Sequence, residues 1–177
     1  MRESPIVIPV KLDEKTFRRF ARFDMLRLRK KWVRPVVFAL ILVAFAMVAL
    51  FSRREQSGLI AAVLLAVGLG LPLVYFGSFL SQVNVQAMRY KLKPPRAVYT
   101  VTLAEDCVTV HNDQKAEENL KLSWKEIPQA FRARKCIYLY VSPARAFLLP
   151  EGQANVPQDQ VWQTLTEKLG PEKCRKV

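Results

Sequence analysis

The sequence has few of the residues that build metal sites and catalytic centres. It contains one histidine and three cysteines in 177 residues, and no two cysteines form a CxxC pair. A zinc site needs about four nitrogen or sulfur ligands at close spacings, which this set cannot supply. Gly-rich phosphate loops and the HExxH and GxSxG sequences are absent as well. We therefore expect a protein that is not an enzyme and binds neither metal nor cofactor.

Two long segments lack any charged side chain. They run from Pro35 to Ser52 and from Ser57 to Leu80, and only residues 53–56 separate them. As helices they would be about 27 Å and about 36 Å long, against a hydrocarbon core of about 30 Å. A four-residue connection permits only a tight hairpin. The sequence therefore predicts two antiparallel transmembrane helices within residues 35–80.

Basic residues are concentrated beside these two segments. Residues 1–34 carry eleven Lys and Arg against four Asp and Glu, and residues 81–96 carry four against none. Lys and Arg near a span stay in the cytoplasm and attract anionic lipid, so both termini are expected to be cytoplasmic. The residues expected at the membrane interface are Arg27, Arg29, Lys30, Lys31, Trp32, Arg34, Arg89, Lys91 and Lys93.

The net charge of +13 does not indicate a nucleic-acid-binding protein. Residues 97–177 are nearly balanced, with eleven basic and ten acidic side chains. A nucleic-acid-binding face would need basic residues with interleaved aromatics on this soluble part. The lipid bilayer is therefore the expected partner of the basic residues, and no nucleic acid is expected.

The N-terminal 34 residues begin with a strand-like piece, Ile6 to Val10, and continue into a helix that starts near Asp13, a suitable N-cap. This helix carries an apolar stripe between arginines, formed by Phe17, Phe20, Phe23 and Leu26. Such a stripe suits the bilayer interface. It would equally suit packing against the protein's own soluble domain, and the pattern leaves both alternatives open.

Small residues recur every four positions along the second apolar segment. They are Gly58, Ala62, Ala66 and Gly70. Small residues at this spacing let helices approach closely in lipid, so we expect a packing face within the hairpin or between copies of the chain. Ala39, Ala46 and Ala49 offer a partner face on the first segment. Pro72 is expected to kink or loosen the second helix.

After a basic linker, residues 81–96, the pattern changes to alternation between apolar and polar residues. Short strands are expected around residues 99–103, 108–111, 120–124, 136–141 and 146–149, and a helix from about Pro157 to Leu169. This predicts a small antiparallel α+β domain of five or six strands and a C-terminal helix over residues 97–177. The expected core residues are Trp124, Ile127, Ile137, Leu139, Val161 and Leu165.

Three runs in this part carry a family resemblance. Trp124–Ile127, Cys136–Tyr140 and Phe147–Pro150, before a Gln-rich stretch and a final helix, resemble the YcxB-like proteins of bacteria. The resemblance implies an amphipathic N-terminal segment, two transmembrane helices and a pleckstrin-homology-like cytoplasmic domain, but no reaction. The chain departs from the family at Glu151, where a basic residue often follows the proline.

A ligand role of this domain would depend on its basic residues. The loop at residues 112–119 is acidic and would repel phosphate. The segment from Phe131 to Lys135 is the better basic candidate, although a solvated charge cluster explains it as well.

These observations predict a non-enzymatic protein of the bacterial inner membrane, with a cytoplasmic domain that binds another protein or a second copy. Two alternatives stay open at this point. The chain could be an immunity protein that protects its own cell from a toxin, or an accessory subunit of a membrane transport complex.

Overall fold

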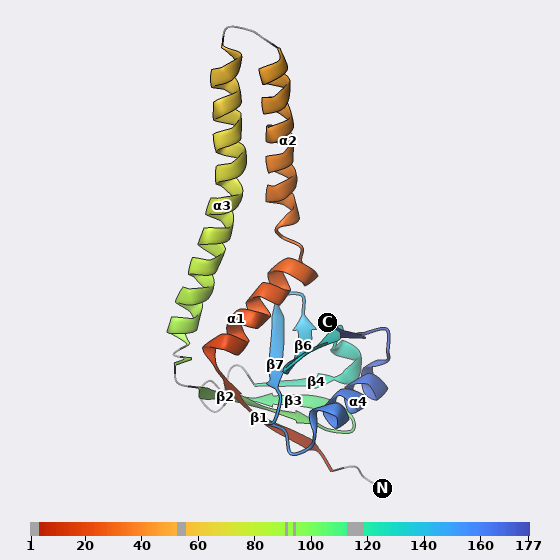
Figure 1. The fold of residues 1–177 in the computed structure, drawn as a ribbon. Coiled ribbons are helices and arrows are strands. Elements are labelled where there is room, and N and C mark those ends of the chain that lie inside the picture. The colour runs from red at the N-terminus through yellow and green to blue at the C-terminus, as the bar shows by residue number, and fades with distance from the viewer. Residues whose placement is uncertain (1–3, 53–55, 91, 94, 113–118) are drawn as a thin grey trace. The chain divides into compact units, whose positions relative to one another are not determined.

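The computed structural model describes residues 4–52, 56–90, 92–93, 95–112 and 119–177 (Figure 1). The chain divides into two compact units. The first combines residues 1–20 with residues 91–177, and the second comprises residues 21–90. Helix α1, Glu14–Phe23, begins in the first unit and ends in the second.

The first sheet of the first unit includes the N-terminal strand. Its order is β1-β2-β3-β4 with antiparallel neighbours, and its strands are β1 Ile6–Leu12, β2 Arg96–Leu103, β3 Cys107–His111 and β4 Leu120–Ser123. Ile6 pairs with Leu103 and Ile8 with Val101, so the two ends of the hairpin segment meet in one sheet. The strand-like N-terminal piece therefore belongs to the first unit.

The second sheet has the order β7-β6-β5-β8. Its strands are β5 Gln129–Ala133, β6 Cys136–Ser142, β7 Arg145–Pro150 and β8 Cys174–Lys176. β8 runs parallel to β5, and the other pairs are antiparallel. Helix α4, Gln158–Leu169, precedes β8. The α+β class is confirmed. The described residues form eight strands, because β5 and β8 add to those expected and β1, the expected N-terminal strand, joins the first sheet.

Trp124 lies in a 3₁₀ turn, η3 Trp124–Glu126, whereas the alternating pattern assigned it to a strand. The strand ends at Ser123 because a capping box forms there, in which the Ser123 N–H donates to the Glu126 carboxylate at 2.6 Å. Trp124 is nonetheless buried. All six residues expected in the core are buried, with Ile127, Ile137, Leu139 and Leu165 fully so.

Strand β6 is covered on both faces. Ile137 and Leu139 lie on one face, and Cys136, Tyr138 and Tyr140 lie on the other, all of them buried. The Phe20 ring of α1 packs against Tyr138 and Tyr140, with centroids 5.2 Å and 6.1 Å away. Of the two alternatives for the phenylalanine stripe, Phe20 therefore takes the contact with the protein's own sheet.

Helix α1 starts where the sequence indicates. The Thr16 N–H donates to the Asp13 carboxylate at 2.9 Å, which caps the helix. Burial alone would raise the pKa of Asp13, but the hydrogen bonds with Thr16 hold it below its usual value. Glu14 then binds Arg18 one turn along and Lys93 at 3.3 Å, so the start of α1 is tied to the segment that precedes β2.

Two amide side chains cover the outer edge of β1. Gln153 accepts from the Lys11 N–H at 2.7 Å and donates to the Lys11 carbonyl at 2.9 Å. The Asn155 side-chain oxygen accepts from the Val7 N–H at 3.1 Å, and the Asn155 backbone N–H donates to the Val7 carbonyl at 3.2 Å. These bonds replace a neighbouring strand, which protects an edge that could otherwise pair with another chain.

The second unit is a helical hairpin. Helix α2, Val33–Phe51, and helix α3, Ser57–Arg89, pack side by side in opposite directions (Figure 1). A short π-helix, η1 Asp24–Leu28, precedes α2. α3 continues nine residues beyond Leu80, so much of the expected linker is helical. Residues 81–89 contain no glycine or proline, and nothing in them ends the helix.

Candidate membrane-interface site

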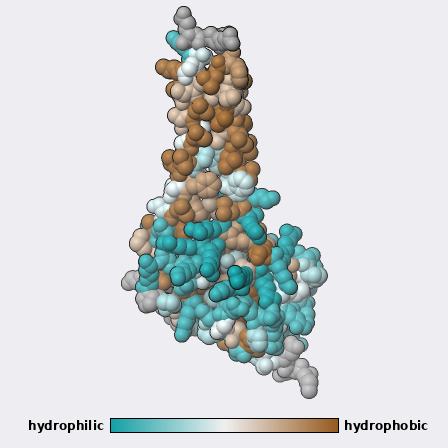
Figure 2. All heavy atoms as spheres, in the orientation of Figure 1, coloured by the Kyte–Doolittle hydropathy of each residue, from teal (hydrophilic) through white to brown (hydrophobic). Residues whose placement is uncertain are grey.

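Helices α2 and α3 are long and apolar enough to cross a membrane. Most of their apolar side chains do not pack inside the protein, since Leu40 is 63% and Leu73 is 73% exposed. In α2 only Ala46 is buried. Figure 2 shows hydrophobic residues over the surface of both helices.

The two helices meet through small residues. A Cβ atom added at Gly68 would lie 3.1 Å from the Leu42 Cβ and 3.5 Å from the Ala39 carbonyl oxygen, so glycine permits this close approach. Ala61 on α3 and Ala46 on α2 are buried as well. The contact uses the alanine face expected on α2.

The face expected on α3 does not form this contact. A Cβ atom added at Gly58 or Gly70 would have no neighbour within 4 Å, and Ala62 and Ala66 are exposed. Steps of four residues drift about 40° around a helix, whereas Ala61 and Gly68, seven apart, return close to the same side. Packing between copies through this face stays a prediction.

The helix contact also fixes the level of the basic residues along the hairpin. Gly68 lies opposite the turn from Ala39 to Leu42, so antiparallel packing places Arg34 near the level of Tyr75. Arg89 is fourteen residues further along α3, which is about 21 Å. The headgroup layer is only about 6 Å thick on each side. The continued helix α3 therefore places Arg89 further along the hairpin than Arg34, and the position of both at a membrane interface stays a prediction.

Some of the remaining predicted interface residues form an ion pair with an acidic side chain of the protein, and others do not. Arg29 binds Asp24 at 2.7 Å, and Lys93 binds Glu14 at 3.3 Å in the first unit. Lys91 lies outside the described residues. Arg27, Lys30, Lys31 and Arg34 are exposed, and Asp24 is the only acidic residue described in the second unit. Three of these cations lie next to Trp32 at the start of α2, and we call them the collar: Lys30, Lys31 and Arg34.

The backbone of the collar is held in a tight turn. The Lys31 N–H donates to the Met25 carbonyl at 3.1 Å, and the Val33 N–H donates to the Lys30 carbonyl at 3.0 Å. The Trp32 indole N–H donates to the Leu26 carbonyl at 3.0 Å. Lys30 has a φ of 46°, in the left-handed region that glycine normally occupies. At this position a glycine would adopt the left-handed backbone conformation at a lower conformational energy than Lys30 does.

The electrostatics of the α2 start add to the charge of the collar. The first turn of α2 contains no acidic residue, and no side chain caps its N–H groups. A helix N-terminus carries about half a positive charge and is stabilised by nearby anions. Three cations and the helix start therefore produce a positive potential that no described acidic side chain offsets.

Tyr75 is a candidate interface residue that the sequence reasoning missed. It lies near the level of Arg34, and its ring packs edge-on against Phe76 at 5.9 Å. Tyrosine and tryptophan are enriched where a membrane meets water. The available signal was that Tyr75 is the only tyrosine within the two apolar segments.

The basic segment of the first unit is partly neutralised. Arg132 binds Asp159 of α4, whereas Arg134 and Lys135 are exposed. β8 places Arg175 beside Phe131 and Lys176 beside Arg132, which joins two basic segments.

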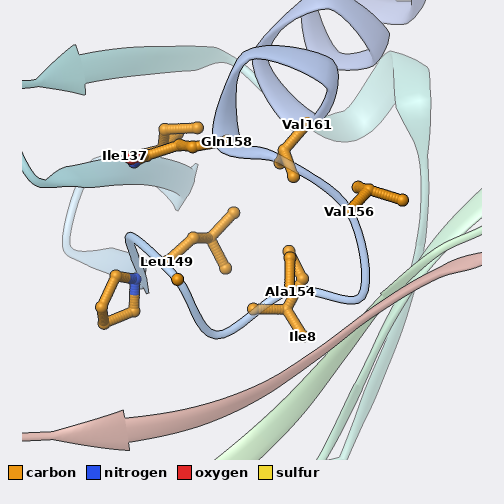
Figure 3. Close-up of a pocket in the computed structure, with 9 residues that line it drawn as sticks. Ile8, Ile137, Leu149, Ala154, Val156, Gln158 and Val161 are labelled. Atoms are coloured by element: carbon orange, nitrogen blue, oxygen red, sulfur yellow. The ribbon is translucent and has the colours of Figure 1, made fainter.

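The cavity in Figure 3 is too small for an organic ligand. Its volume is about 10 Å³, close to that of a single water, and it lies between Ile8 of β1, Ile137 of β6 and Val161 of α4. The buried Nε2 of Gln158, which also lines it, has no hydrogen-bond partner among the described residues.

Comparison of the chain with protein-family models, with curated proteins and with solved structures found no match. The exposed apolar helices and the cations beside them are therefore the features of this chain that point to a function.

Proposed function

We propose that this chain is a non-enzymatic protein of the bacterial inner membrane that spans the bilayer twice and holds both termini in the cytoplasm. Its first unit would be a pleckstrin-homology-like domain that works by binding another protein or a second copy. Two four-stranded sheets and the helix α4 after the seventh strand support this part of the proposal.

The exposed apolar surface of α2 and α3 carries the proposal. Only 6% and 11% of their most apolar 18-residue windows are buried, whereas a core helix of a soluble protein would be mostly buried. Phe45 is 59% and Leu59 is 70% exposed. An apolar surface of this extent is unfavourable in water, by about 25 cal/mol per Å². Lipid would surround the hairpin on all sides.

The distribution of charge supports the orientation. The exposed cations Arg27, Lys30, Lys31 and Arg34 lie at the end of the hairpin where α2 begins. Because Lys and Arg flanking a span stay in the cytoplasm, this end would face inward, and the tip at residues 53–56 would face outward.

A role in binding fits the side chains of the first unit better than a role in catalysis. Burial raises the pKa of the Cys136 thiol to about 12, so this cysteine stays protonated at neutral pH and is a poor nucleophile. Within the described ranges, no three His, Cys, Asp or Glu side chains are grouped so that they could hold a metal ion.

Thiol labelling of intact cells tests the membrane topology. A Ser57→Cys variant should react with an impermeant maleimide added from outside, whereas Cys174 of the parent chain should react only after the cells are permeabilised. Labelling of Cys174 in intact cells would overturn the proposed orientation. Release of the protein from membranes by alkaline carbonate would overturn the two spans.

Co-capture tests the binding role. Two differently tagged copies of the full chain are expressed at low level, crosslinked in cells and purified in detergent. Recovery of the second copy supports self-association, and recovery of one other protein at a fixed ratio supports a heterologous partner. Recovery of neither would contradict the proposed function.

A further inference from the structure

We propose that the collar, Lys30, Lys31 and Arg34, is a binding site for the headgroup of an anionic phospholipid such as phosphatidylglycerol. The inference rests on the proposed function, because it requires that α2 and α3 lie in a bilayer. The collar cations would select an anionic headgroup, whereas Arg89 would not contribute to this preference.

Within the described residues of the second unit, the collar charges have no acidic partner. The only described acid of the second unit, Asp24, is bound to Arg29 at 2.7 Å. All three collar residues are exposed, and they lie within five positions of one another. The start of α2, which has no acidic residue in its first turn, adds positive potential at the same place. An external phosphate would supply the negative charge that the described residues of this unit do not provide.

The collar is also at the depth where a headgroup lies. α2 supplies apolar side chains from Pro35 onward, so the collar lies directly beside the apolar surface. Trp32 within it and Tyr75 at the same level are residues that favour the boundary of the bilayer. Hydrogen bonds to the Met25 and Leu26 carbonyls hold the Lys31 backbone and the Trp32 indole, so the backbone of the turn is ordered before lipid binds.

Arg89 provides a matched control within the same unit. It is an exposed cation, but it lies about 21 Å further along α3 than Tyr75. Electrostatic attraction to the leaflet falls off within about 10 Å at 0.1 M salt. Arg89→Gln removes one charge from the chain and should leave the lipid preference unchanged.

The test measures quenching of Trp32 fluorescence by brominated lipids in nanodiscs. The full chain is titrated with brominated phosphatidylglycerol or brominated phosphatidylcholine, and a Trp32→Phe chain gives the background from the other tryptophans. Wild type should be quenched at a lower fraction of the anionic lipid. Each cation removed should reduce the preference about fivefold, so a Lys30→Gln, Lys31→Gln, Arg34→Gln triple variant should lose nearly all of it.

The outcomes separate this inference from the proposed function. If neither lipid quenches Trp32, the hairpin is not in the bilayer and the proposed function fails. If both lipids quench wild type equally, the hairpin is inserted and only the lipid site fails. Loss of preference in Arg89→Gln equal to that in Arg34→Gln would show a diffuse charge effect and overturn the collar. Reversal by millimolar inorganic phosphate at constant ionic strength would show a site for free phosphate instead.

Discussion

The Tyr99 hydroxyl on β2 bonds both backbone groups of Leu148 on β7. It accepts from the Leu148 N–H at 2.8 Å and donates to the Leu148 carbonyl at 3.2 Å. β7 is an edge strand of the second sheet, so a tyrosine from the first sheet takes the place of a neighbouring strand. The Tyr99 ring also packs edge-on against Phe147, with centroids 5.1 Å apart. This contact joins the two sheets.

Removing the Tyr99 hydroxyl should destabilise the first unit. Tyr99→Phe leaves the Leu148 N–H and carbonyl without their partner, and we expect a loss of about 1–3 kcal/mol in the free energy of unfolding. Thermal unfolding in detergent, followed by near-UV circular dichroism, measures the loss. Thr164→Val is the control, because that hydroxyl bonds only the Gln160 carbonyl on an exposed part of α4. An equal loss in both variants would contradict the structural role of Tyr99.

Alkaline pH should destabilise the protein from about pH 9 upward. The buried Cys136 thiol has its pKa raised to about 12, whereas in the unfolded chain it ionises near pH 9. Between these values the folded state holds a proton that the unfolded state has lost, so stability falls by up to about 1.4 kcal/mol per pH unit.

The Cys136→Ala variant isolates this effect. Burial also raises the pKa of Tyr138 to about 12 and that of Tyr99, but unfolded tyrosines ionise only near pH 10. The variant should therefore show a flatter stability curve between pH 9 and pH 10, measured by denaturant titration at each pH. An unchanged slope would mean that the thiol ionises in the folded state.

Local patterns in the sequence indicated the strands whose alternation is long and regular. β2, β3 and β6 follow from the spacing of residues such as Val101, Val110 and Leu139. The Ile6–Val10 strand was visible too, but its partner β2 lies about 90 residues away, and a local pattern does not encode such pairing. β8 has three residues and parallel pairing to β5, which is too short for any periodic signal.

The candidate site was predicted in part for a similar reason. Composition located the apolar helices and the basic residues beside them, but not the level of each residue along the hairpin. That level depends on the contact of Gly68 with Leu42, which separates Arg89 from Arg34. The phenylalanine stripe of α1 has the same period whether lipid or a sheet covers it, so only the Phe20 contact with Tyr138 distinguishes the two.

Helix packing in the hairpin should depend on Gly68 and not on Ala66. Gly68→Leu places a bulky side chain where a Cβ atom already lies 3.1 Å from Leu42, so we expect the helices to separate and the thermal stability in detergent to fall. Ala66 is exposed, and Ala66→Leu should leave the hairpin intact. Disulfide crosslinking between cysteines introduced at Val36 and Tyr75 reports on the hairpin.

The same pair of variants tests association between copies. If the face of Gly58, Ala62, Ala66 and Gly70 meets a second chain, Ala66→Leu should abolish crosslinks between copies while those within the hairpin persist. Unchanged crosslinks between copies would show that this face does not contact a second chain. An intact hairpin in Gly68→Leu would contradict the packing described above.

Substitution of Trp124 and His111 should separate folding from chemistry in the first unit. Trp124 is 8% exposed, and its indole N–H donates to the Ala104 and Glu105 carbonyls, both at 3.1 Å. Trp124→Ala should cost about 3–5 kcal/mol and abolish co-capture of the partner by unfolding the domain. His111 is an exposed residue at the end of β3, so His111→Ala should keep both the fold and the partner.

Protease resistance of the first unit makes this comparison decisive. A resistant His111→Ala protein that still captures its partner supports a role in binding, because the chain's only histidine is then dispensable. A resistant His111→Ala protein that has lost cellular activity while capture persists would instead assign His111 a chemical role, since neither unfolding nor loss of the partner could explain the defect. That result would reopen catalysis as the function of the domain.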